Sequence, residues 1–215
     1  MRVLRPVRWT SSLGVAVLAG AILITAISLV PDTAFAGGDP GAPVYVTGGK
    51  STGKPVYDIG DSITRLTASN LEWSLKQDSY VINATPSITM AKSLPAIKNA
   101  VATMPAQNWV IELGTNDAYN NNAQADLRNE IDAVSGQLCV ILVTISPRLG
   151  DIATSLNQSM WWQAYADPKF HVLDWGNIEY NNPHWVTTDN VHPAKQGKKE
   201  LALLERRALK DFCKK

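Results

Sequence analysis

From residue 55 to the C-terminus, short runs rich in β-branched and aromatic residues alternate with stretches of helical period. The runs predict strands at Val56–Ile59, Tyr80–Asn83, Trp109–Leu113, Leu138–Ile145 and Phe170–Leu173. The expected helices are Thr64–Gln77, one opened by Ser93 and Pro95, one along Leu127, Ile131 and Val134, Ser155–Ala166, and a last one from Pro193. Because a helical crossover usually connects parallel strands, this alternation predicts an α/β fold with a five-stranded parallel sheet covered on both faces.

The uninterrupted apolar run from Cys139 to Val143 is typical of a strand buried on both faces, and we expect it at the centre of the sheet. Cys139 begins this strand, and Cys213 ends a helix that runs antiparallel to it, so both cysteines should lie at the same sheet edge. They either form a disulfide or remain two unpaired buried thiols, and the distance between them decides which.

The N-terminal segment, residues 1–36, has the pattern of an export signal. Three arginines precede an uncharged run over residues 9–31, and Ala34-Phe35-Ala36 supplies the small residues of a cleavage site. We favour cleavage after Ala36 over a retained signal anchor, although the apolar run is nearly long enough to span a membrane. Residues 37–54 form a lead-in segment in which Val44-Tyr45-Val46 indicates a short strand, and residues 55–215 form the domain.

Composition narrows the function. With 20 Lys+Arg, 19 Asp+Glu, a net charge of +1 and two cysteines, the chain is no basic nucleic-acid binder, zinc module or multi-bridge disulfide scaffold. A glycine-rich phosphate loop is also not expected, because Val44 stands where such a motif needs its first glycine. A compact enzyme or binding domain remains.

Two polar segments follow predicted strands and a third precedes the last helix, so all three can converge at the sheet edge where ligands of parallel sheets bind. A serine hydroxyl becomes a nucleophile when an imidazole takes its proton and a carboxylate orients that imidazole. Ser62, His192 and Asp189 supply these groups, while Asn116 and the Ser62 backbone N–H could stabilise an oxyanion. The segments are Gly60-Asp61-Ser62-Ile63-Thr64, Gly114-Thr115-Asn116-Asp117 and Asp189-Asn190-Val191-His192-Pro193.

Taken singly, each residue also has an ordinary structural interpretation. Ser62 could be a helix N-cap, His192 a cap or surface residue, and Asn116-Asp117 a turn. Metal binding by His171, His184 and His192 with acidic residues is a further alternative, but three scattered histidines more often have separate structural roles.

In order and spacing, the three segments resemble the blocks of the GDSL-type, or SGNH, hydrolases. The resemblance covers residue 55 to the C-terminus and implies a three-layer, flavodoxin-like α/β/α sandwich and ester or acyl-ester chemistry. It implies Ser62 as nucleophile, Asn116 in the oxyanion hole, and Asp189 and His192 as acid and base.

The chain departs from the family pattern at two positions. Ser87 stands where the family has a glycine whose backbone N–H joins the oxyanion hole, and a side chain there narrows the approach. Asn190 lies where glycine is common between the acid and the base, and asparagine tolerates left-handed turns.

These features predict an exported serine esterase of carboxylic esters, which needs no metal or cofactor. It would be secreted or extracytoplasmic and monomeric, and would contact a membrane only if residues 9–31 are retained as an anchor. An O-acyltransferase and a non-catalytic cell-surface carbohydrate binder are the alternatives. Exposed aromatic residues would suit an O-acetylated carbohydrate, although tryptophans usually pack into cores, and a lipid ester is equally compatible. The aromatic residues in question are Trp161, Trp162, Trp175 and Trp185.

Overall fold

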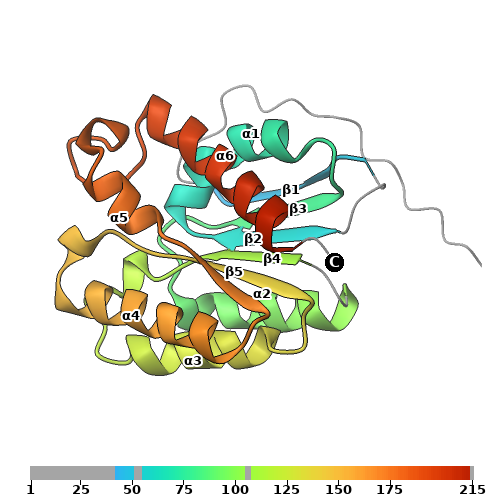
Figure 1. The fold of residues 1–215 in the computed structure, drawn as a ribbon, viewed down its shortest axis with the longest axis horizontal. Helices are drawn as coiled ribbons and strands as arrows, with labels where there is room; N and C mark the ends of the chain where they lie inside the picture. Colours follow the sequence, from blue (N-terminus) through green and yellow to red (C-terminus); the bar gives the residue numbers. More distant parts are fainter. Residues whose placement is uncertain (1–41, 51–54, 105–107, 214–215) are drawn as a thin grey trace, which may run out of the picture. The chain divides into compact units, whose positions relative to one another are not determined.

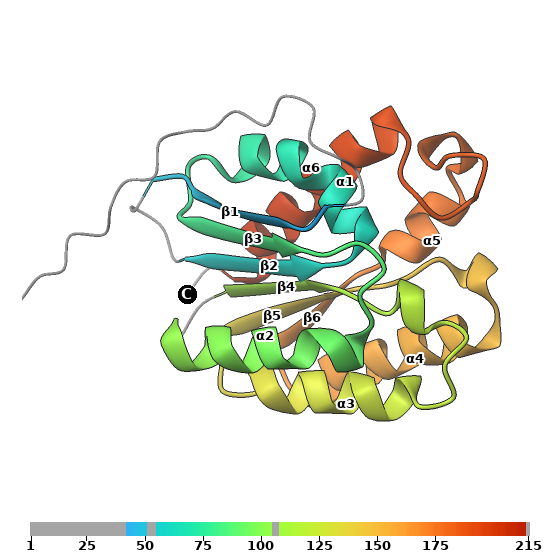
Figure 2. The same ribbon diagram turned by 180° about the vertical axis from the view of Figure 1, so that it is seen from behind.

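The computed structural model describes residues 42–50, 55–104 and 108–213, which form a six-stranded sheet between two layers of helices (Figures 1 and 2). The predicted export signal lies outside these residues. The predicted α/β/α sandwich is confirmed. The strands are β1 (Val44–Gly48), β2 (Val56–Gly60), β3 (Tyr80–Ala84), β4 (Asn108–Glu112), β5 (Cys139–Val143) and β6 (Phe170–Leu173).

Helices cover both faces of the sheet, and short 3₁₀ turns lie in the loops between the elements. The helices are α1 (Ser62–Leu75), α2 (Met90–Thr103), α3 (Ala123–Val134), α4 (Asp151–Ala166), α5 (Trp175–Tyr180) and α6 (Lys195–Phe212), with 3₁₀ turns η1 (Thr115–Asp117) after β4, η2 (Pro147–Leu149) after β5 and η3 (Pro183–Trp185) after α5. Two apolar cores separate the layers. One lies between the sheet and α2, α3 and α4, and the other between the sheet and α1 and α6.

The sheet has one strand more than the five predicted. Its order is β1-β3-β2-β4-β5-β6, and β1 pairs antiparallel with β3 while all other pairs are parallel. In β1 the buried Val44 alternates with the exposed Tyr45, as in a half-covered edge strand. The sequence indicated a short strand at Val44-Tyr45-Val46 but not its place in the sheet, because an antiparallel edge strand needs no crossover helix. The lead-in segment therefore completes the sheet.

The strand of Cys139–Val143 is buried throughout, but its predicted place at the centre of the sheet is wrong. β5 lies between β4 and β6, one strand from the edge, and the middle of the sheet is formed by β2 and β4. A strand is buried on both faces when helices cover both sides of the sheet, so its burial does not show where it lies in the strand order. The strand order reverses at β2, because β3 lies on one side of it and β4 on the other. Ligands of open parallel sheets bind at the carboxyl ends of the strands at such a point.

The second helix begins earlier than predicted. Ser93 is not its N-cap, because α2 starts at Met90, and the Ser93 hydroxyl lies 2.8 Å from Met90 O and 2.6 Å from Glu130 Oε1, within hydrogen-bond distance of both. Asp117, from the loop after β4, accepts from the Met90 N–H at 3.0 Å and so caps the helix from outside.

Three carboxyl groups are buried between the sheet and the α1–α6 layer. Asp58 of β2, Glu112 of β4 and Glu205 of α6 are each 2% exposed or less, and Glu112 accepts a hydrogen bond from the Thr64 hydroxyl. Burial raises the pKa of Asp58 to about 7. Burial, and then the charges of Asp58 and Glu112, raise the pKa of Glu205 well above its usual value. The core therefore holds carboxyl groups that keep their protons far above pH 4.

Cys139, at the start of β5, and Cys213, after α6, are joined by a disulfide with their Cα atoms 5.5 Å apart. The bond closes a loop across a sequence separation of 74 residues and fixes the far end of α6 to the sheet. Cross-linking a loop of this length stabilises a fold by about 4 kcal/mol in the chain-entropy model.

We predict that the double variant Cys139→Ser/Cys213→Ser lowers the free energy of unfolding by about 2–4 kcal/mol, because its unfolded chain regains the entropy of the open loop. Urea denaturation of the variant and of the oxidised and reduced wild type measures this. The reduced wild type should match the variant. A variant as stable as the oxidised protein would contradict the prediction.

Candidate active site

Ser62 is placed by a tight turn between β2 and α1. A Cβ on Gly60 would lie 1.8 Å from Thr64 Oγ1 and 2.9 Å from Glu112 O, so only glycine fits there. The buried Asp61 caps α1 by accepting from the Ile63 N–H at 2.9 Å. Ser62 thereby becomes the first residue of the helix, where backbone N–H groups lack partners within the helix and the dipole favours negative charge.

Asp189 and His192 lie in the loop before α6, and this loop brings the imidazole to Ser62. His192 Nε2 lies 2.9 Å from Ser62 Oγ, and His192 Nδ1 lies 2.7 Å from Asp189 Oδ2. Burial alone would raise the pKa of Asp189, but hydrogen bonds from the His192 ring and backbone, the Thr187 hydroxyl and the Val191 N–H hold it well below its usual range. An ionised carboxylate only accepts, so Nδ1 carries the proton and Nε2 is free to accept from the serine hydroxyl.

The loop that carries this pair is held by backbone contacts. Val186 and Pro193 form a β-bridge, and the Thr187 N–H donates to His192 O at 2.8 Å. Asn190 has φ 59°, the left-handed conformation expected where glycine is common. At the start of α6, a Cβ on Gly197 would lie 2.0 Å from Trp185 O, so glycine permits this close approach.

Asn116 lies beside the Ser62 turn, but its amide is already engaged. Its Nδ2 donates to Asp61 Oδ2 at 3.1 Å and to Ile88 O at 3.0 Å. These two bonds use both amide hydrogens. The amide reaches an oxyanion only by exchanging one of them.

Ser87 has φ 59°, so it holds the left-handed conformation that glycine adopts without strain. Its turn lies next to the Ser62 turn, because the Thr85 N–H donates to Gly60 O at 3.1 Å. The Ser87 side chain is exposed. The backbone therefore has the form that the family's glycine would give it, but with a hydroxymethyl group added.

Two aspartates of the sequence blocks accept hydrogen bonds from distant residues, which the sequence analysis did not predict. Asp61 joins the first block to Asn116 of the second, and burial raises its pKa to about 7. Asp117 joins the second block to the start of α2, and burial raises its pKa as well. The one available signal was the position of Asp61, three residues before the predicted helix at Thr64–Gln77.

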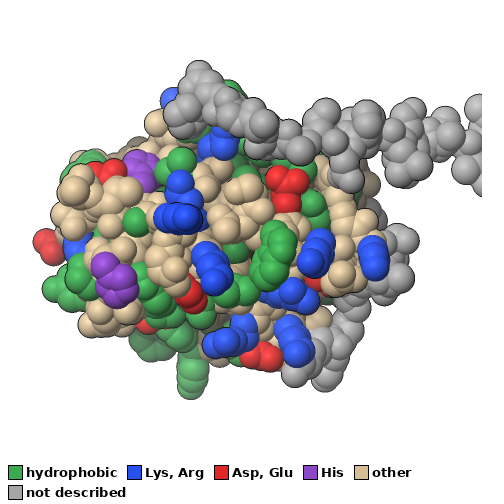
Figure 3. All heavy atoms as spheres, turned by 90° about the horizontal axis from the view of Figure 1, so that it is seen from above, with side chains coloured by type: hydrophobic (Ala, Val, Ile, Leu, Met, Phe, Trp, Pro, Cys, Tyr) green, Lys and Arg blue, Asp and Glu red, His purple; other side chains and the backbone are tan. Residues whose placement is uncertain are grey.

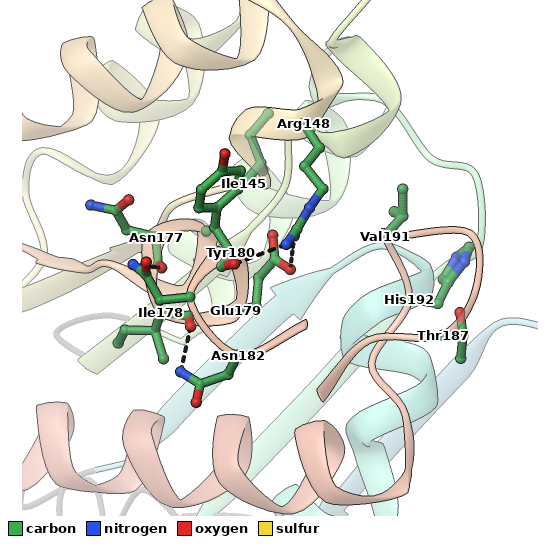
Figure 4. Close-up of polar contacts among 12 residues, drawn as sticks. Ile145, Arg148, Asn177, Ile178, Glu179, Tyr180, Asn182, Thr187, Val191 and His192 are labelled. Atoms are coloured by element: carbon green, nitrogen blue, oxygen red, sulfur yellow. Dashed lines mark hydrogen bonds and ion pairs between the residues drawn. The ribbon is translucent and has the colours of Figure 1, made fainter. Parts of the chain in front are cut away.

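An arginine contact at the same sheet edge was also missed by sequence reasoning. Arg148 Nη1 pairs with the buried Glu179 at 2.6 Å, and Nη2 donates to Tyr180 O at 2.9 Å (Figure 4). The guanidinium also lies 4.6 Å from the centre of the Tyr180 ring. Figure 4 shows His192 on the neighbouring loop. These contacts fasten α5 to the loop after β5.

The three histidines do not form a metal site. His171 lies on β6 and stacks on Phe212, with ring centres 4.6 Å apart, while His184 lies in η3 beside Trp185. Among the residues that the structure describes, no group of three or more His, Cys, Asp or Glu side chains is arranged to hold a metal ion.

The aromatic residues considered for carbohydrate stacking divide into two groups. Trp161 and Trp162 on α4 are 49% and 66% exposed. Trp175 is buried in the core beside Trp185, with ring centres 6.2 Å apart, as tryptophans usually are, and so is not available for stacking on a sugar. Of the four tryptophans considered, only Trp161 and Trp162 therefore offer well-exposed rings.

Within the described ranges, no helix combines the length and apolar character needed to cross a bilayer.

Comparison with known proteins gives one curated relative and several solved structures. No protein-family model matches the chain. The chain is 28% identical over 160 residues to the "Putative peptidoglycan O-acetyltransferase YrhL" of Bacillus subtilis (strain 168), across 74% of this chain and 24% of that protein. The chain thus spans about a quarter of the length of this curated relative.

The solved structures share the architecture. The chain matches the C-terminal catalytic domain of Streptococcus pneumoniae peptidoglycan O-acetyltransferase A with a TM-score of 0.65 and 24% identity, over 75% of this chain and 96% of that one. It matches a GDSL-like lipase from Bacteroides thetaiotaomicron with a TM-score of 0.61 and 21% identity, over 73% of this chain and 88% of that one. The chain therefore has the fold of the GDSL-type, or SGNH, hydrolases, as its three sequence blocks predicted.

Proposed function

We propose that this chain is an extracytoplasmic serine enzyme that hydrolyses carboxylic esters on carbohydrate through an acyl-enzyme. The observation that carries the proposal is the hydrogen-bond chain from Ser62 Oγ to His192 (2.9 Å) and from His192 to Asp189 (2.7 Å). These distances are within the range in which a base takes a proton from a nucleophile.

In the proposed reaction Ser62 Oγ attacks the ester carbonyl carbon while His192 Nε2 takes the hydroxyl proton. The tetrahedral intermediate collapses, the carbon–oxygen bond to the alcohol breaks, and His192 returns the proton to the departing alcohol oxygen. Water then attacks the acyl group on Ser62 with His192 as base, which releases the carboxylic acid and restores the serine. Asp189 keeps the imidazole in its tautomer and stabilises the imidazolium that forms.

The oxyanion would be held by the backbone N–H groups of Ser62 and Ser87 and by the Asn116 amide. The first lies at the N-terminus of α1, which favours negative charge. The Asn116 amide would release Ile88 O or Asp61 Oδ2 to reach it. No step requires a metal or cofactor, because nucleophile, base and donors all belong to the chain.

Carbohydrate is the proposed substrate class because of the relatives and of the exposed rings on α4. The curated relative and one structural neighbour are named as peptidoglycan O-acetyltransferases. Trp161 and Trp162 offer flat apolar faces of the kind that stack on sugar rings. The predicted export signal at residues 1–36 supports an extracytoplasmic location, where such polymers occur.

An O-acetyltransferase is the second candidate, and the same two relatives favour it. A transferase would form the same acyl-Ser62 and pass the acyl group to a sugar hydroxyl in place of water. A non-catalytic carbohydrate binder is the third alternative, and the short Ser62–His192 distance argues against it.

We predict that Ser62→Ala lowers turnover of a short activated ester by a factor on the order of 10⁶, because no other group can form the acyl-enzyme. Ester hydrolysis measures this, and mass spectrometry should find a serine-reactive phosphonate on Ser62 in the wild type only. Ser69→Ala, at an exposed serine on the same helix, is the control and should keep full turnover. Undiminished hydrolysis by Ser62→Ala, or a folded wild type that the phosphonate does not label, would refute the assignment.

Adding a sugar acceptor separates hydrolysis from transfer. For an esterase, we expect free acid to account for nearly all the acyl groups released, because water reaches acyl-Ser62. Product analysis with and without a soluble chitooligosaccharide measures the share that is transferred. A predominantly acetylated acceptor would replace the esterase assignment with that of a transferase.

We predict that Ser87→Gly raises kcat/KM for the same ester, because it removes the side chain at the cleft and keeps the backbone N–H. Ser87→Val should lower stability by about 1–2 kcal/mol, since a β-branched residue is strained at positive φ. Kinetics and urea denaturation of both variants test this. A slower Ser87→Gly enzyme with wild-type stability would show that the hydroxymethyl group itself takes part.

A further inference from the structure

The exposed side of α6 carries a row of basic side chains. Lys195, Lys199, Arg206 and Lys210 occupy positions i, i+4, i+11 and i+15 of the helix, which places them on one face. The row is about 22 Å long at the rise of an α-helix. Lys198 and Arg207 flank it, and these six residues are called the α6 basic row.

None of these six cations makes an ion pair or side-chain hydrogen bond with the residues that the structure describes. Elsewhere Arg148 pairs with Glu179, and Lys169 with Asp167. The acidic residues of α6 do not match the six cations in number: they are Glu200, which bonds to Gln196, the buried Glu205, and Asp211 near the C-terminal end of the helix. Figure 3 shows blue basic side chains spread across this face. The row is therefore a local excess of positive charge on a chain whose net charge is +1.

The surface beside the row is hollowed. At the start of α6, a hollow of about 720 Å³ toward α1 is lined by Asn70, Lys195, Gln196, Lys198 and Lys199. Ammonium and amide groups bind carboxylates and hydroxyls, and a hollow admits a single polymer strand but not the broad surface of a bilayer. The lining thus fits a polar, negatively charged polymer better than a membrane surface.

The row also begins at the proposed active site. Lys195 is the first residue of α6 and follows His192 by three positions, so the row leads away from the loop that holds the imidazole. A polymer strand with one ester at Ser62 could then continue along α6.

We infer that the α6 basic row binds a glycan polymer that carries carboxylates, and that it holds this strand while one of its acyl esters lies at Ser62. The inference rests on the proposed function for the position of the ester, and on charge complementarity for the polymer. Several weak contacts along one strand act together, so the row contributes affinity and orientation without touching the reacting atoms.

Binding of the full chain to polygalacturonate tests the inference without any turnover, because this polymer carries carboxylates and no ester. We expect Lys195→Gln/Lys199→Gln to lower the affinity about fivefold at low salt. The matched control is Lys92→Gln/Lys98→Gln on α2, at the opposite face of the sheet, which should bind like the wild type. Wild-type affinity should also fall as salt rises from about 20 to 200 mM, because salt screens these charges. Urea denaturation shows whether both variants are folded.

Several results would overturn the inference. These are equal binding of a neutral glycan such as unsubstituted xylan, equal losses in the two double variants, or tighter binding of poly(glycerol phosphate) or phosphatidylglycerol vesicles than of polygalacturonate. The proposed function is judged separately by the Ser62→Ala experiment. If the protein binds polygalacturonate through its carboxylates but does not hydrolyse esters, the inference about the α6 basic row stands and the proposed catalytic function is wrong.

Discussion

The hydrogen bond between Ser62 Oγ and His192 Nε2 joins residues that are 130 positions apart, and the rest of the site depends on it. It requires α6 to lie beside α1 on the same sheet face, with the loop before α6 closed by its β-bridge. The close approach of Gly197 to Trp185 O fixes where the helix starts. A displacement of the first turn of α6 would therefore separate the base from the nucleophile even with every strand in place.

Much of the fold follows from local patterns that the sequence displays. The five parallel strands were predicted within a few residues, because continuous β-branched runs and turn residues mark strands that are covered on both faces. Features decided by distant contacts were not predictable. The start of α2 is fixed by Asp117, 27 residues away, and the place of β1 at the edge of the sheet is set by its pairing with β3.

In the candidate site too, local patterns predicted some features and distant contacts decided others. The residue types of the three blocks indicated which side chains would meet, and the structure brings Ser62, His192 and Asp189 into contact. The bonds of Asn116 to Asp61 and Ile88 could not be foreseen, since they depend on how two loops pack. The sequence left open which of the four tryptophans would be buried, and Trp175 packs beside Trp185, which comes from a later loop.

The buried carboxyl groups of Asp58, Glu112 and Glu205 have a consequence for the medium in which the fold is most stable. An unfolded chain releases the Asp58 proton near pH 4, whereas the folded chain keeps it until about pH 7. The stabilisation from a raised carboxyl pKa is complete at acidic pH and is lost as pH rises through the folded value. Mildly acidic pH therefore favours the folded state, and alkaline pH lowers its stability because carboxyl groups buried in the core would have to ionise.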